Sequence, residues 1–123
     1  MPVIRVEVPE GTSPESKHRI RAGVKQAVLD TLAPKEVKYD YVAVREVLAE
    51  IGDGVPLVEV DLRPGRSPER KKALVDAIAA LLKLELGVEA RDLYVLFREN
   101  PAENHYTGGE PLAEWVPASE LGD

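Results

Sequence analysis

Apolar and polar residues alternate near the start of the chain. Ile4, Val6 and Val8 fall at every second position of residues 3–8, a period typical of a half-buried β-strand. The period then lengthens to four over residues 20–32, which predicts one apolar face of a helix; the residues on that face are Ile20, Val24, Val28 and Leu32.

Turn and capping residues separate these two segments. Gly11 supplies a turn, and Ser13 is a favourable helix N-cap. Pro14 suits the first helical position, where no backbone donor is needed, and Glu15 meets the positive end of the helix dipole. Pro34 should end the helix, and residues 39–47, rich in β-branched and aromatic side chains, predict a second strand. The unit is therefore a right-handed β-α-β crossover.

The same pattern returns 54 positions later. Ser67-Pro68-Glu69 repeats Ser13-Pro14-Glu15, and Gly65 repeats Gly11. A strand is predicted over 57–62, a helix after Pro68, and a closing strand over 93–97. Gly87 follows the helix as a left-handed C-terminal residue. The apolar face of this helix consists of Leu74, Ile78, Leu82 and Leu86.

This duplication predicts an α+β fold: tandem β-α-β units forming a four-stranded sheet with two helices on one face. We expect a single domain over 1–123, built of repeats 2–48 and 56–110, with Gly52-Asp53-Gly54 as linker. Residues 99–110 predict a loop or small hairpin, and Trp115 anchors a short C-terminal tail. Residues 94–97 are apolar on both sides, which suits a sheet buried on both faces. Other copies of the chain would cover the second face, so we expect a homo-oligomer.

Composition and charge restrict the kinds of partner that the chain can bind. The 123 residues include 44% hydrophobic residues, enough for one modest core, and no cysteine for a disulfide or thiol nucleophile. The net charge of −6 argues against a nucleic-acid partner, and the Arg70-Lys71-Lys72 run is interpreted as a solvated helix face. No apolar run is long enough to span a bilayer, and no signal peptide is evident. The expectation is a soluble cytoplasmic protein.

The order of proline, strand, Gly-Arg-Ser turn, helix, strand and Asn-His-Tyr-Thr-Gly-Gly-Glu resembles the tautomerase superfamily, typified by 4-oxalocrotonate tautomerase. The likeness covers almost the whole chain and points to the fused, two-copy members. That group also includes malonate semialdehyde decarboxylase and cis-3-chloroacrylic acid dehalogenase. The resemblance implies the fold of that superfamily, with homotrimer assembly, and a small carboxylate as substrate.

In that family, loss of the initiator methionine frees a proline amine that acts as catalytic base or acid, which here implies Pro2. The exposed α-amine has a reference pKa near 8. An apolar pocket beside arginines would lower this pKa further, because desolvation and like charge both disfavour the ammonium form. A neutral amine at pH 7 can accept a proton next to a carbonyl.

The resemblance implies that Arg63 and Arg66 bind the substrate carboxylate. Planar guanidinium groups grip a carboxylate in two places and stabilise a developing enolate. The alternative is a pair of solvated loop arginines. Thr12 stands where Arg66 stands in the second copy, and Pro56 has an amide nitrogen. We therefore expect one active site per chain.

Departures from the family restrict the chemistry. The dehalogenase's histidine falls at Val28 or Leu29, its tyrosine near Leu96 and its glutamate near Thr107, so a hydrolytic dehalogenase is not expected. Gap-free counting puts the decarboxylase's aspartate on Lys38, with Asp40 as a substitute; a structural role for Asp40 is the alternative. His105 or Tyr106 could line the pocket. Neither His18 nor His105 has metal-ligand spacing to a second ligand, and no metal or cofactor is implied.

The prediction is a cofactor-independent keto–enol tautomerase acting on a small 2-oxo or 2-hydroxy-dienoate acid, with Pro2, Arg63 and Arg66 as catalytic residues and Asp40, His105 and Tyr106 as substrate-binding residues. Two alternatives remain open. One is a decarboxylase or hydratase acting on a 3-oxo acid, in which a cationic Pro2 polarises the carbonyl. The other is a non-catalytic oligomeric module.

Overall fold

A computed structural model describes residues 2–32, 41–48 and 57–111 of the chain. It contains two long helices and six strands, together with two short 3₁₀ turns, η1 (Ala90–Asp92) and η2 (Ala102–Asn104). In chain order the helices and strands are β1 (Val3–Pro9), α1 (Pro14–Thr31), β2 (Val42–Val47), β3 (Leu57–Leu62), α2 (Pro68–Leu86), β4 (Tyr94–Glu99), β5 (Tyr106–Thr107) and β6 (Glu110–Pro111).

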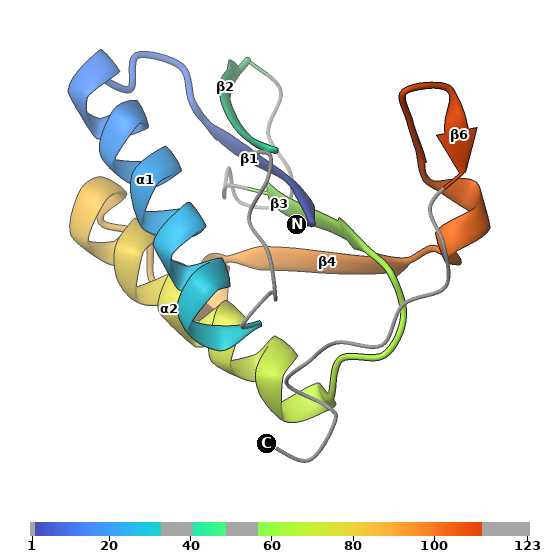
Figure 1. Cartoon of the computed structure of the whole chain (residues 1–123). Coiled ribbons are helices and arrows are strands. Elements are labelled where there is room, and N and C mark those ends of the chain that lie inside the picture. Colours follow the sequence, from blue (N-terminus) through green and yellow to red (C-terminus); the bar gives the residue numbers. More distant parts are fainter. Residues whose placement is uncertain (1, 33–40, 49–56, 112–123) are drawn as a thin grey trace.

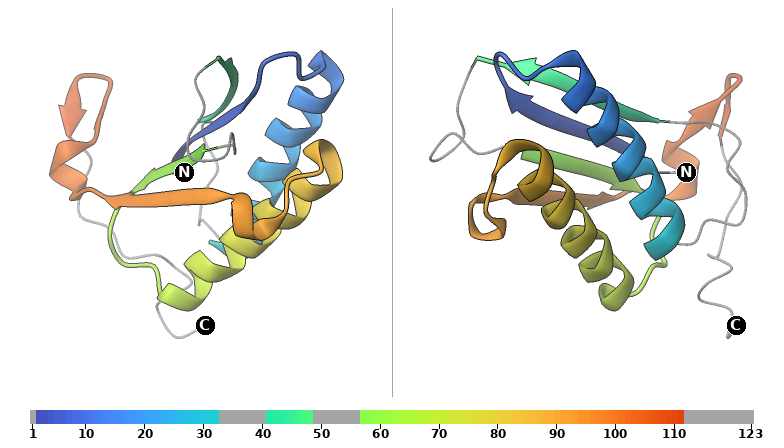
Figure 2. Two further views of the ribbon diagram at one scale, coloured as in Figure 1. Left: turned by 180° about the vertical axis from the view of Figure 1, so that it is seen from behind. Right: turned by 90° about the vertical axis from the view of Figure 1, so that its left-hand side faces the viewer.

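The four longer strands form one sheet in the order β2-β1-β3-β4. Each β-α-β unit contributes a parallel pair, β1 with β2 and β3 with β4, and the two units meet through the antiparallel pair of β1 and β3. Both helices lie on the same face of the sheet (Figures 1 and 2). The predicted fold class is confirmed.

The two repeats are related by a local two-fold axis. Arg5 pairs with Glu59 across the antiparallel strands, and these residues occupy equivalent positions of the duplication. The equivalence shifts by one residue on the outer strands, because Ile4 pairs with Val42 whereas its counterpart Val58 pairs with Val95. The offset is therefore 54 on β1 and β3 but 53 on β2 and β4. This makes Tyr94 the counterpart of Tyr41, not of Asp40 as gap-free counting gives.

The core lies between the sheet and the helices, on the faces that the sequence periods predict. Of the predicted apolar positions, all are fully buried except Leu86, which packs partly buried at the margin of the core. Ser13 and Ser67 cap their helices by accepting hydrogen bonds from the backbone N–H groups of Ser16 and Arg70. Gly87 is left-handed at φ 71°, as predicted.

The helix-free face of the sheet carries charged as well as apolar side chains. Tyr94 and Leu96 are exposed, and charged side chains from β1, β3 and β4 lie beside them. In the single chain this face is therefore open and largely ionic. The strand ends differ from the prediction: β2 begins at Val42 within the predicted 39–47, and β4 runs to Glu99, two residues beyond the predicted end.

The segment after β4 forms the predicted small hairpin from β5 and β6, which projects away from the rest of the fold (Figure 1). Gly108 and Gly109 turn this hairpin with φ values of 62° and 84°. Trp115, the linker 52–54 and Asp40 fall outside the described residues.

Candidate active site

Pro2 is buried at the head of β1. The antiparallel register pairs Val3 with Asp61, and continuing it by one residue sets Pro2 opposite Leu62. Residues that face each other across antiparallel strands have Cβ atoms about 4.5–5.5 Å apart. The strand pairing of the two repeats thus brings Pro2 next to the segment that carries Arg63.

Arg63 is half-buried directly after β3. Burial lowers the pKa of its guanidinium group, because removal from water disfavours the charged form. Arginine nevertheless stays protonated at neutral pH. A partly desolvated cation therefore lies at the end of the strand that faces Pro2.

Arg66 is buried, with only 6% of its surface exposed. Its Nε donates a hydrogen bond of 3.3 Å to the carbonyl of Leu32, and Nη1 of Arg70 donates one of 3.2 Å to the carbonyl of Thr31. Both cations therefore lie at the C-terminal end of α1, where the helix dipole favours positive charge. The alternative interpretation of Arg66 as a solvated loop residue is wrong, and Arg70 is only partly solvated.

His105 is fixed in the arm that follows β4. Its Nε2 lies 3.0 Å from the carbonyl oxygen of Asn100, so this nitrogen donates the proton. The backbone N–H of Asn100 in turn donates to the carbonyl of Leu62 at 2.8 Å. This series of contacts ties His105 to the residue that faces Pro2. Tyr106, the next residue, is exposed on the hairpin.

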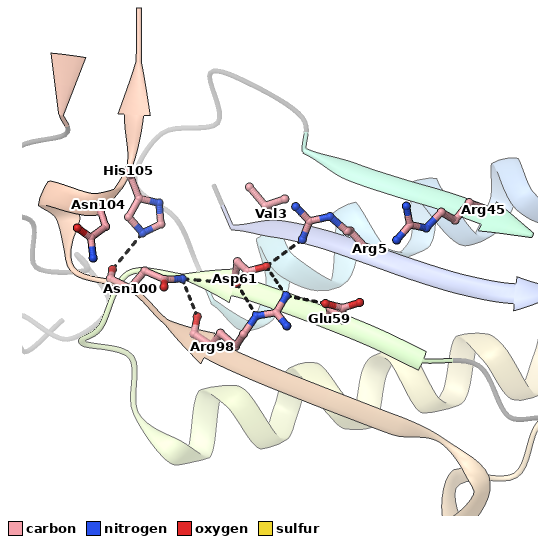
Figure 3. Close-up of a pocket in the computed structure, with 9 residues that line it drawn as sticks. All are labelled: Val3, Arg5, Arg45, Glu59, Asp61, Arg98, Asn100, Asn104 and His105. Carbon is pink, nitrogen blue, oxygen red and sulfur yellow. Dashed lines mark hydrogen bonds and ion pairs between the residues drawn. The ribbon is translucent and has the colours of Figure 1, made fainter. Parts of the chain in front are cut away.

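A pocket of about 510 Å³ opens on the helix-free face of the sheet (Figure 3). His105 lies at one end of it, and Val3 lies nearer its middle. The remaining lining residues are Arg5, Arg45, Glu59, Asp61, Arg98, Asn100 and Asn104. Of the predicted site residues in the described part of the chain, only His105 lines this pocket.

An ionic cluster forms the floor of the pocket. Asp61 accepts hydrogen bonds from Arg98 Nε and Arg98 Nη2, both at 2.9 Å, and from Arg5 Nη1 at 2.9 Å. Arg98 Nη2 also contacts Glu59 at 2.6 Å. The bonds from Arg98, and then that from Arg5, outweigh the effect of burial and lower the pKa of Asp61 to about 2. The same pairing raises the pKa of Arg98.

Sequence reasoning missed this cluster, although a signal for it exists. Arg5, Glu59 and Asp61 occupy the polar positions of two alternating strands. Their opposite charges become meaningful once β1 and β3 are known to pair, because cross-strand neighbours of opposite charge stabilise a sheet.

Two negative findings apply to the described ranges. Within residues 2–32, 41–48 and 57–111, no three His, Asp or Glu side chains converge in a way that could hold a metal ion. Over the same residues, neither long helix is apolar enough to cross a bilayer.

A tandem β-α-β sheet with a proline at the head of β1 and an arginine turn after β3 is the arrangement of the tautomerase superfamily. Comparison with known proteins agrees: residues 56–114 match the family model described as tautomerase enzyme. The match covers the second repeat, so this half of the chain is similar to the tautomerase family. Comparison with curated proteins finds no match.

Solved structures share the fold over most of the chain. The wild-type R7 fused 4-OT, solved as an asymmetric trimer, has a TM-score of 0.78 at 20% identity, covering 89% of this chain and 94% of its own. Malonate semialdehyde decarboxylase has a TM-score of 0.68 at 20% identity, covering 86% of this chain and 90% of its own. N1, a member of the cis-3-chloroacrylic acid dehalogenase family, has a TM-score of 0.74 at 22% identity, covering 96% of this chain and 87% of its own.

Proposed function

We propose that this chain is a cofactor-independent keto–enol tautomerase with Pro2 as the proton carrier. The observation that supports this most is the buried position of Pro2, which the register of β1 and β3 sets opposite Leu62, the residue before the half-buried Arg63. The proposal requires Met1 to be removed, because only then is the proline nitrogen a titratable amine.

Burial and a neighbouring cation act in the same direction on that amine. Each favours the neutral form, so the pKa of the Pro2 amine should fall below its reference value near 8. In the proposed reaction, neutral Pro2 takes the hydroxyl proton of a 2-hydroxy-dienoate acid, and the electron pair moves to form the 2-oxo group. The protonated amine then gives the proton to carbon.

Arg63 and Arg66 are proposed to hold the carboxylate and the oxygen on which negative charge develops. Arg66 is suited to this role because its burial and its bond to the carbonyl of Leu32 fix the guanidinium before substrate arrives. A preorganised cation costs no reorganisation during reaction. Removing either cation is expected to weaken binding of the substrate carboxylate.

Three further residues are proposed to contact the substrate. His105 donates from Nε2 to Asn100, so its Nδ1 is left to accept a hydrogen bond from a ligand in the pocket. Asp40 and Tyr106 are proposed as further lining residues, with Tyr106 supplied by the projecting hairpin.

A homotrimer is proposed as the working assembly. The sheet face away from the helices is uncovered in the single chain, and a two-stranded hairpin is at best marginally stable alone, so both need a neighbour. The structurally similar R7 fused 4-OT is an asymmetric trimer.

The test compares the wild-type protein with Pro2→Ala, using Pro14→Ala as a matched proline control at the first turn of α1. Intact mass should show loss of Met1. Turnover of a phenylpyruvate-type enol should fall by about two or more orders of magnitude in Pro2→Ala, as expected for loss of a general base, and stay unchanged in Pro14→Ala. Retained Met1, or full activity of Pro2→Ala, would refute the proposal.

The pH dependence of kcat/KM separates this function from the decarboxylase or hydratase alternative. A rising limb with a pKa well below 8 indicates a neutral amine acting as base. An amine with a pKa near 9 or above, together with release of carbon dioxide from a 3-oxo acid, would instead indicate a cationic Pro2 that polarises the carbonyl. Inactivity on both substrate classes would favour the non-catalytic module.

A further inference from the structure

The pocket on the helix-free face contains two arginines that the proposed reaction does not use. Arg5 lies on β1 and Arg45 on the neighbouring strand β2, and both side chains run toward Val3 (Figure 3). They form fewer hydrogen bonds and ion pairs with described residues than Arg98, the third arginine that lines the pocket.

The carboxylates of the pocket are already engaged. Asp61 accepts three hydrogen bonds from Arg98 and Arg5, and Glu59 accepts one from Arg98. Arg5 uses only Nη1, leaving most of its five N–H groups unused. Arg45 makes no hydrogen bond or ion pair with any other residue that the structure describes.

The internal duplication explains why Arg45 has no counter-ion among the residues that the structure describes. The offset of 53 makes Arg45 the counterpart of Arg98, and Arg98 is neutralised by Asp61 and Glu59. In the first repeat, the position equivalent to Glu59 is Arg5, so an anion has been replaced by a second cation. Glu7 pairs with Arg45 in the strand register but forms no ion pair with it among the described residues.

We propose that Arg5 and Arg45 form a binding site for a small oxyanion with two negative charges, of the phosphate or dicarboxylate class. Planar guanidinium groups with unused donors bind such oxyanions in two places, and an anion here would take the position that Glu59 holds in the other repeat. The site shares its pocket with His105 but uses none of Pro2, Arg63 and Arg66, which do not line it.

Isothermal titration calorimetry of the intact wild-type protein with inorganic phosphate, and separately with succinate, tests the proposal at low ionic strength. Saturable binding is expected, and the preferred anion distinguishes the two sources. Arg45→Gln should weaken binding at least about tenfold, as expected for loss of a charge-assisted contact. Arg45→Lys should retain part of the affinity, because the charge remains while the bidentate geometry is lost.

Two controls isolate the site. Arg91→Gln removes an arginine whose side chain is 84% exposed outside the pocket, so it should leave phosphate binding unchanged. Pro2→Ala should also bind phosphate with wild-type affinity, because Pro2 does not line this pocket. Circular dichroism establishes whether each variant folds. If Arg45→Gln does not fold, Arg45→Lys is compared with the wild type instead.

Absence of saturable binding to the wild type, or equal affinities of the wild type and Arg45→Gln, would overturn the proposal. So would a change in oligomeric state of Arg45→Gln without any anion binding by the wild type. That outcome would mean that a carboxylate of another copy of the chain pairs with Arg45.

Discussion

Asp61→Asn removes one negative charge from the centre of the ionic cluster and replaces one of the two accepting oxygens by an NH2 donor. The carboxylate of Asp61 receives hydrogen bonds from Arg98 and Arg5, and a longer one of 3.5 Å from the Asn100 amide. Asparagine has nearly the same shape, so packing against the sheet is preserved. The variant therefore measures how much the carboxylate, through its charge and its second accepting oxygen, stabilises the pairing of β1, β3 and β4.

The pKa of Asp61 gives the size of its contribution to the free energy of unfolding. Pairing lowers it from an ordinary value of 3.8 to about 2. A shift of one unit corresponds to about 1.4 kcal/mol, so the upper bound is about 2.4 kcal/mol. The side chain is 19% exposed, and solvent screening reduces this to about 1–2 kcal/mol. Because the folded pKa lies below the unfolded one, the stabilisation is complete above about pH 5 and is lost as the pH falls from about 4 to 2.

Urea unfolding followed by far-ultraviolet circular dichroism, at one fixed protein concentration, measures the effect. At pH 7, Asp61→Asn should unfold with a free energy about 1–2 kcal/mol below wild type, and the gap should narrow toward pH 2. Asp76→Asn is the matched control: its side chain is 61% exposed and pairs only with Lys72 within α2, so less than about 0.5 kcal/mol is expected. A gap of equal size at pH 7 and pH 3 would refute an origin in the charge of Asp61.

Two further predictions concern the helices. Gly23→Val should destabilise the fold by about 1–3 kcal/mol, because a Cβ at Gly23 would lie 2.7 Å from Cδ2 of Leu81; a double-mutant cycle with Leu81→Ala should give a coupling above about 0.5 kcal/mol. Ser67→Ala should cost about 1 kcal/mol, because the N–H of Arg70 loses its acceptor, whereas Ser67→Asp should retain the cap. Urea midpoints measure both; additivity in the cycle, or equal stability of the two Ser67 variants, would contradict them.

The sequence predicted those features that depend on local periodicity and capping. Ser13 and Ser67 cap the helices, and Ile20 and Leu74 are buried where the helical period places them. The ionic surroundings of Tyr94 and Leu96 were harder to predict, because they depend on the charged residues of β3, the strand that pairs with β4. The one-residue shift of the outer strands could not be read from β1 and β3, which keep an offset of 54.

The candidate site was predictable only in part for the same reason. The position of Pro2 at the head of a strand is local, but its neighbour Leu62 follows from the antiparallel pairing of two strands more than fifty residues apart. The environment of Arg66 depends on the carbonyl of Leu32 at the end of the other helix. No local pattern encodes that contact, so the sequence indicated the residue type and not its burial.

The two turns of the duplication show why the repeats cannot be functionally equal. Thr12 donates from Oγ1 to the carbonyl of Pro9 at 2.7 Å and so closes its own turn. Arg66, at the equivalent position, reaches out of its turn to the end of α1. A short hydroxyl cannot make that contact or supply a cation. The same divergence occurs at the two-fold axis, where Arg5 faces Glu59. A symmetric fold thus carries charge on one side of the axis that the other side lacks, and both proposed sites depend on that difference.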